Sequence, residues 1–132
     1  MHKPAGVATH SKKRKGSTGK AGRPTKPLIT RRAAAQKALE LIDRDGLKGL
    51  SLGALAKEMN VRAPSLYHHF RDKDELLAQV ARALLEEIDQ EQDVWSDDWE
   101  ARTIELSLAT RRVAMRHPNA ATLALRFFPR QL

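Results

Sequence analysis

Apolar residues recur at helical spacing along most of this chain, and turn residues separate the helical stretches. The first such stretch follows the i, i+4, i+7, i+8 pattern of a helix with one buried face, at Ala34, Ala38, Leu41 and Ile42. Thr30 precedes it as a capping residue. Gly46 ends it, because glycine adopts the left-handed backbone of a helix end at little cost. A first helix is therefore predicted between Thr30 and Gly46.

Two short helices are predicted next. Ser51 caps the first of them, whose apolar positions are Leu52, Leu55, Ala56 and Met59. Pro64 lies in the first turn of the second, where its missing N–H costs no hydrogen bond, and Leu66 and Phe70 can face inward. Helices separated by so few residues must cross steeply, as in a helix-turn-helix, which presents the polar side of residues 62–69 outward. A plain helical bundle with a polar surface is the alternative.

A longer fourth helix begins at Asp72, which forms a capping-box-like pair with Glu75. Its apolar stripe comprises Leu77, Val80, Ala81, Leu84, Leu85 and Ile88. Because helical spacing accounts for the apolar residues throughout, the predicted fold class is all-α.

The remaining residues predict an acidic hinge and two more helices. The hinge covers residues 89–98, and Ser96 is expected to cap a fifth helix. That helix carries an apolar stripe at Trp99, Thr103, Leu106, Thr110 and Val113. His117-Pro118 ends it, and residues 119–128 predict a short last helix. Trp95 and Trp99 are expected to pack in a core or an interface.

The positive charge is concentrated at the N-terminus. The chain has 132 residues and a formal net charge of +8. Residues 1–28 hold eight basic and no acidic residues, whereas the rest holds sixteen of each. Residues 1–27 have little to bury and are expected to form a disordered basic tail. Nucleic-acid phosphates are the expected target of such a polycation, because neutralising them releases counterions. A tail that only confers solubility is the alternative.

Composition excludes several classes of protein. The absence of cysteine removes disulfide scaffolds, thiolate metal sites and cysteine nucleophiles. No apolar run reaches the roughly 18 residues of a membrane span and no secretory signal is present, so a cytoplasmic location is expected. Neighbouring residues on a helix point about 100° apart, so His68 and His69 do not predict a metal site. Neither a cofactor nor an enzymatic activity is expected.

A specific string of residues then points to a family. The chain closely resembles the DNA-binding domain of the tetracycline-repressor (TetR) family. The resemblance is carried by Gly49-Leu50-Ser51-Leu52, Leu55-Ala56, the run from Val61 to Phe70, Lys73 and Leu76-Leu77. The resemblance extends from about Leu28 to Ile88. It implies an N-terminal three-helix helix-turn-helix DNA-binding domain over residues 28–88. Residues 89–132 would form the first helices of a partial C-terminal domain for ligand binding and dimerisation.

The resemblance also implies a function. Members of the family are bacterial transcriptional regulators, usually repressors, that bind a palindromic operator in double-stranded DNA as homodimers. In this chain the helix-turn-helix would span residues 51–70. The competing function is an architectural DNA-binding protein in which the basic tail dominates and sequence matters little.

Residue by residue, the resemblance assigns DNA contacts to Ser51, Arg62, Ala63, Pro64, Ser65, Tyr67, His68 and Lys73. Residues 62–65 would open the recognition helix and meet base edges. Tyr67, His68 and Lys73 would hold the DNA backbone, and Ser51 would offer its hydroxyl to a phosphate. Structural roles are the alternatives, such as a wedge between helices for Tyr67. Where some relatives carry a base-reading arginine, this chain has Gly53, so specificity would depend on the recognition helix.

The C-terminal third is expected to be incomplete. In the family, the inducer pocket is lined by this region and by later helices, and subunits pair through helices near the end of a chain of about 200 residues. With 132 residues, the usual dimerisation helices would be absent and the inducer pocket incomplete. The side chains then expected to lack partners are Leu123, Leu125, Phe127 and Phe128. Truncation, pairing through another surface and DNA binding without an inducer stay open as explanations.

Overall fold

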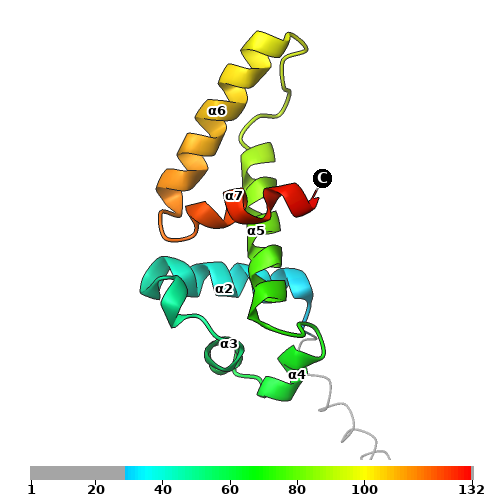
Figure 1. Ribbon diagram of the computed structural model, residues 1–132, viewed down its shortest axis with the longest axis vertical. Helices are drawn as coiled ribbons and strands as arrows, with labels where there is room; N and C mark the ends of the chain where they lie inside the picture. The colour runs from blue at the N-terminus through cyan, green and yellow to red at the C-terminus, as the bar shows by residue number, and fades with distance from the viewer. Residues whose placement is uncertain (1–28, 132) are drawn as a thin grey trace, which may run out of the picture.

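The computed structural model describes residues 29–131, and all regular structure within them is helical (Figure 1). The elements are α2 (Arg31–Asp45), the 3-10 turn η2 (Leu47–Gly49), α3 (Leu52–Glu58), α4 (Ala63–Tyr67), α5 (Lys73–Asp89), α6 (Trp99–Arg116) and α7 (Ala121–Gln131). The expected all-α fold is therefore confirmed for this part of the chain. The expectation of a disordered tail over residues 1–27 lies outside the described residues.

Helix α2 begins and ends as its sequence predicts. The Thr30 hydroxyl oxygen accepts a hydrogen bond from the Ala33 N–H at 2.9 Å, which satisfies a donor that the first turn leaves free. Gly46 follows the helix with φ of 84°, and its N–H donates to Ile42 at 2.8 Å. Because φ lies in the left-handed region, glycine relieves a strain that a side chain would introduce there.

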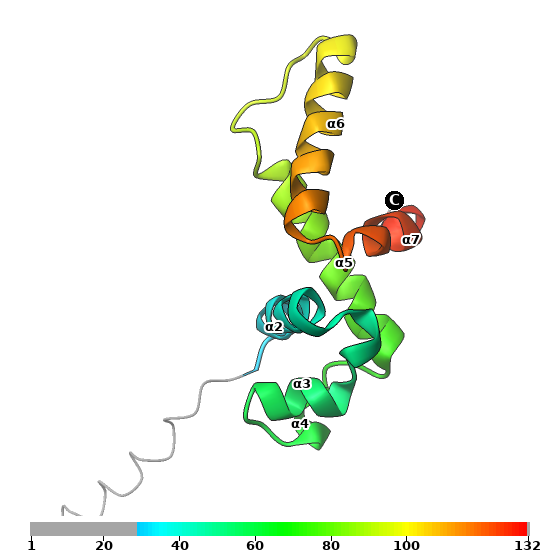
Figure 2. The same cartoon turned by 90° about the vertical axis from the view of Figure 1, so that its left-hand side faces the viewer.

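Helix α5 runs through the middle of the molecule, and α2 and α7 cross it (Figures 1 and 2). Helices α3 and α4 lie together at one end, whereas α6 extends toward the opposite end. A single hydrophobic cluster joins these elements, and its largest fully buried side chains are Phe70, Phe127, Ile42, Leu50, Leu55, Leu66, Leu76, Leu84, Leu123 and Val80. The cluster includes residues from both sides of the domain boundary expected at residues 88–89. The two expected domains therefore share one hydrophobic core within the described residues.

The start of α6 differs from the sequence prediction. Asp98, not Ser96, is the capping residue, because its carboxylate accepts the Ala101 N–H at 2.9 Å. Ser96 instead accepts the Asp98 N–H at 3.2 Å and donates its own N–H to Glu105 at 2.9 Å. Both residue types favour caps, so the pattern alone could not separate two candidates that lie two positions apart.

The C-terminal apolar residues also depart from expectation. Leu123 and Phe127 do not lack partners: they are fully buried, because α7 folds back across α5. Leu125 is 80% exposed as expected, and the side chain of Phe128 lies outside the described part. Exposed apolar surface lies instead along α6, where only Ala109 and Val113 are buried. Trp99 is 73% exposed and therefore does not pack in the core, whereas Trp95 packs against its edge.

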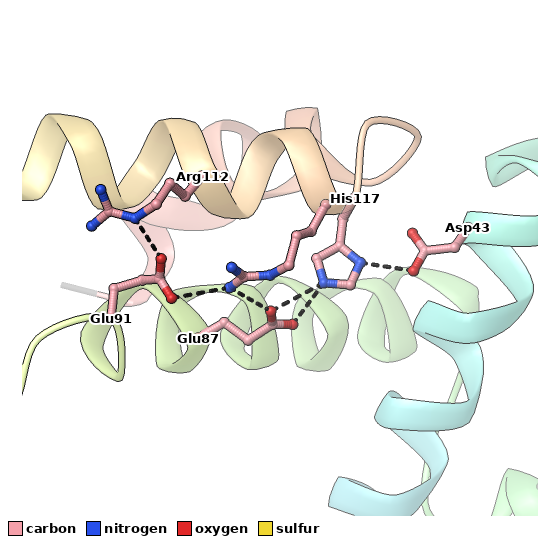
Figure 3. A network of polar contacts seen from close by, with 6 residues as sticks. Asp43, Glu87, Glu91, Arg112 and His117 are labelled. Carbon is pink, nitrogen blue, oxygen red and sulfur yellow. Dashed lines mark hydrogen bonds and ion pairs between the residues drawn. The ribbon is translucent and has the colours of Figure 1, made fainter.

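A network of polar side chains joins α6 to α5 and α2 (Figure 3). Arg112 lies 2.7 Å from Glu91, and Arg116 lies 3.2 Å from Glu87 and 3.3 Å from Glu91. Hydrogen bonds from both arginines, Arg112 foremost, hold the pKa of Glu91 below its ordinary value. The network fixes the part of α6 near its C-terminus against the end of α5.

Two kinds of site are absent from the described residues. None of the helices between residues 29 and 131 has the length and apolar character needed to cross a membrane. Over the same residues, no group of three or more His, Asp or Glu side chains is arranged to hold a metal ion.

Candidate nucleic-acid interface

The turn between α3 and α4 is built by local hydrogen bonds. The Val61 N–H reaches back to the Ala56 carbonyl at 2.9 Å, and the Asn60 N–H to that of Lys57 at 3.1 Å. Asn60 adopts φ of 56°, the left-handed conformation that closes a helix in this Schellman arrangement. Asparagine tolerates this conformation better than most residues with a side chain. The turn therefore directs the chain sharply from α3 into α4.

Helix α4 has one anchored face and one free face. Leu66 and the following Phe70 are fully buried, which holds the short helix against the core. Its outer side comprises the exposed Arg62, Pro64, Tyr67 and His68 and the half-buried Ser65 and His69, whereas the half-buried Ala63 packs against the core. No acidic residue occurs between Arg62 and Arg71, so this face would not repel a phosphate backbone. It lies at the end of the molecule far from α6 (Figure 2).

Six of the eight predicted contact residues thus lie together at α4, from Arg62 to His68. Tyr67 is 55% exposed, so its phenol is accessible rather than wedged between helices. Ser51 lies at the start of α3, where its oxygen accepts the Ala54 N–H at 2.9 Å. Its hydroxyl hydrogen is still free to donate, because a hydroxyl can donate and accept at once.

Lys73 lies apart from the other candidates, at the first position of α5. Its ammonium donates to the Leu47 carbonyl in η2 at 3.3 Å, and the residue is half-buried. This contact ties α5 to the connection before α3. A lysine has three donors, so a phosphate contact stays a prediction alongside this structural role.

Gly53 lies on the exposed side of α3. A Cβ added there would meet no atom closer than the Ser51 hydroxyl oxygen at 3.9 Å, which is ordinary van der Waals contact. Packing within the protein therefore does not require glycine at this position, although glycine weakens a helix interior.

An arginine outside the predicted set of contact residues supports the end of α4. The Arg31 guanidinium donates to the His69 carbonyl and lies 3.2 Å from Glu75. It also stacks over the Phe70 ring at 4.8 Å from the ring centre. No local signal could have identified this role, because 38 positions separate Arg31 from His69.

The same contact corrects the expected capping box at α5. Asp72 accepts the Glu75 N–H at 2.9 Å as predicted. Among the described contacts the Glu75 carboxylate reaches Arg31 and, at 3.7 Å, Arg71, and does not return to Asp72. A charged partner on another helix offers it a stronger interaction than a backbone N–H.

A second ion pair joins α2 to α3. Arg44 lies 3.0 Å from Asp45 and 3.1 Å from Glu58. Hydrogen bonding to these carboxylates raises the pKa of Arg44, and its guanidinium lowers the pKa of Asp45. This side of α3 therefore presents both signs of charge.

The sequence is similar to those of known transcriptional regulators. Residues 35–80 match the model of the bacterial regulatory proteins of the tetR family. An HTH-type transcriptional regulator of Saccharopolyspora erythraea is 40% identical over 103 residues, which cover 76% of this chain and 42% of that protein. Tetracycline repressor protein class C of Escherichia coli is 40% identical over 57 residues, 43% of this chain and 26% of the repressor.

The fold is also similar to those of solved transcriptional regulators. A possible TetR family transcriptional regulator from Streptomyces coelicolor superposes with a TM-score of 0.62 at 32% identity, over 71% of this chain and 46% of that one. TetR from Acinetobacter baumannii does so with a TM-score of 0.62 at 28% identity, over 72% and 50%. The chain thus spans about half the length of these relatives. These relatives are named as transcriptional regulators, and residues 35–80 of this chain carry the N-terminal domain of the tetR family of bacterial regulatory proteins.

Proposed function

We propose that the chain is a sequence-specific DNA-binding regulator of transcription in the bacterial cytoplasm, where it represses its target from a palindromic operator. The observation that carries this proposal is the outer face of α4, which is free of acidic residues and anchored by two fully buried side chains. A rigid helix of this kind fits the major groove, where base edges present distinct donors and acceptors. Relatives named as repressors support the sign of regulation.

Within this proposal, each candidate residue has a stated task. Arg62 donates to a guanine, since its guanidinium matches the two acceptors of that base. Tyr67, His68 and Lys73 hold phosphates and set the register of α4 in the groove. Ser51 donates its remaining hydroxyl hydrogen to a phosphate at the start of α3.

The partners follow from the same geometry. One copy of α4 reaches only a few base pairs, so a palindromic operator requires a homodimer with its half-sites about 34–36 Å apart. The proposed regulation is by a small-molecule inducer. A solved relative supports it, because a variant of TetR from Acinetobacter baumannii forms a complex with minocycline.

Selection of bound duplexes from a random pool, followed by measurement of the mass of the complex, tests the function. The expected result is an enriched palindrome that carries two copies of the chain. It should be preferred over random DNA by about 10³ or more at physiological salt. A pool that stays random after selection would contradict sequence-specific binding.

A second function is supported by the charge of residues 1–28, which carry the whole net charge of the chain. In this case the protein coats DNA through its basic segment regardless of sequence. Removing residues 2–26 separates the two functions. A regulator keeps its preference for the enriched duplex and loses only part of its salt dependence, whereas an architectural protein loses most of its binding.

A further inference from the structure

We propose that Arg31 is a positioning residue for DNA reading, which sets the placement of α4 without touching DNA itself. This inference rests on the proposed function, because it assigns a residue to the accuracy of that function. Arg31 was not among the residues that the sequence assigned to DNA.

Arg31 lies where three elements meet. It is the first residue of α2, and the capped turn at Thr30 holds its backbone in place. Its guanidinium donates to the carbonyl of His69, which follows the last turn of α4. The same group lies 3.2 Å from Glu75 in the first turn of α5. One planar group therefore joins α2, the end of α4 and α5.

The contact with His69 matters because α4 is very short. The helix spans only Ala63–Tyr67, so few hydrogen bonds of its own hold its end. The N–H groups of His69 and Phe70 both donate to the Leu66 carbonyl at 2.9 Å. A positive charge beside the carbonyls at a helix C-terminus is favourable. Arg31 supplies that charge from an element outside the helix-turn-helix.

Phe70 orients the Arg31 guanidinium. Its ring is fully buried and lies under the guanidinium at 4.8 Å. Stacking on the ring fixes the plane of the guanidinium, and the Nη1 group donates both to the carbonyl of His69 and to the carboxylate of Glu75. A shift of α4 along its axis would move the His69 carbonyl and the Phe70 ring, which follow it directly, away from the guanidinium that Glu75 holds from α5. The angle at which α4 meets a groove is therefore coupled to Arg31.

The positive charge of Arg31 is already paired with a carboxylate of the protein. Glu75 neutralises this charge, and the Arg31 side chain is 41% exposed. Arg32 offers a matched comparison, because it also lies in the first turn of α2 and is also paired with a glutamate. Its guanidinium lies 3.2 Å from Glu86, and its side chain is 71% exposed. Among the described residues, Arg32 makes no polar contact with α4. Replacing either arginine removes one positive charge from the same end of α2.

The experiment compares Arg31→Ala, Arg31→Lys and Arg32→Ala with the unaltered chain. Binding is measured to the duplex enriched from a random pool and to a random-sequence duplex of equal length, across a series of salt concentrations. Circular dichroism establishes that each variant is folded. Hydrogen exchange of the His68, His69 and Phe70 amides is measured without DNA.

Arg31→Ala should weaken binding to the enriched duplex about tenfold, the loss expected for one charged hydrogen bond, and leave binding to random DNA unchanged. Its salt dependence should equal that of the unaltered chain, and the three amides should exchange faster. Arg31→Lys should show the same losses to a smaller degree, because lysine keeps the charge and lacks the planar group. Arg32→Ala should leave the preference for the enriched duplex intact.

Two results would overturn the inference. Equal losses on both duplexes, with a salt slope reduced by about 0.9, would make Arg31 an ordinary phosphate contact. Unchanged preference and unchanged amide exchange would leave it without a role in reading. If Arg31→Ala does not fold, Arg31→Lys decides by the same readouts. Failure of the unaltered chain to prefer any duplex would refute the proposed function instead.

Discussion

The Nδ1 atom of His117 lies 2.7 Å from a carboxylate oxygen of Asp43, although 74 positions separate the two residues in the sequence. On its other side, the imidazole Nε2 lies 2.8 Å from Glu87 in α5 (Figure 3). Close by, the Asn119 side chain donates to the Ile42 carbonyl at 3.0 Å. The turn between α6 and α7 is therefore held to the C-terminal end of α2, the helix that carries Arg31 at its other end.

Replacing His117 with alanine should loosen this turn. The change removes contacts with two carboxylates and should lower the free energy of unfolding by about 1–2 kcal/mol. Urea denaturation near neutral pH measures it. Arg111→Ala is the control, because that exposed side chain makes no polar contact with another group within residues 29–131. Similar losses in both variants would show that the bridge adds no stability.

Phe127→Ala tests the packing of α7 on α5. Loss of a fully buried phenyl ring should cost about 3–5 kcal/mol of unfolding free energy. Leu125→Ala, on the same helix with its side chain 80% exposed, should stay within about 0.5 kcal/mol of the unaltered chain. Thermal denaturation of the two variants measures the contrast. Equal stabilities would mean that α7 does not dock in solution.

Gly53→Ala should stabilise the protein. The added methyl group fits at 3.9 Å from its nearest neighbour, and alanine favours a helix over glycine by about 1 kcal/mol. Gly46→Ala should have the opposite sign, because φ of 84° strains a residue with a side chain. Melting temperatures of the pair test both statements, and a loss of stability on Gly53→Ala would contradict the first.

Arg62→Ala tests base reading by α4. Binding to the enriched duplex should weaken by about 1–3 kcal/mol, since a bidentate contact to guanine is lost. Binding to random DNA should change far less, and titration of both duplexes at one salt concentration shows the difference. Equal weakening on the two duplexes would indicate a phosphate contact instead.

Acid should weaken the junction of α5 and α6. Since the folded-state pKa of Glu91 lies below its unfolded value, its ion pairs stabilise the fold above the unfolded pKa. That stabilisation is lost as the pH falls through the folded pKa. Denaturation measured from neutral pH into acid should show a steeper loss in the unaltered chain than in Glu91→Gln. Parallel curves for the two proteins would argue against this contribution.

The candidate contact residues show how far local pattern reaches. Ser51 at a cap, Pro64 in a first turn, and Leu66 and Phe70 at inward positions all follow from the spacing of residue types, and the structure confirms these placements. Their roles at DNA stay predictions. The spacing could not show that Lys73 is directed to the Leu47 carbonyl or that Arg31 braces α4, because those contacts join distant segments.

By itself, the sequence determined where most helices begin and end, because capping and helical periodicity depend on residues a few positions apart. Thr30, Gly46, Ser51 and Asp72 all act as their local pattern predicts. Only the tertiary structure decided that α7 folds back to bury Leu123 and Phe127, and that His117 reaches Asp43. Which apolar face finds a partner depends on how whole helices pack in space, and periodicity along one helix carries no information about that choice.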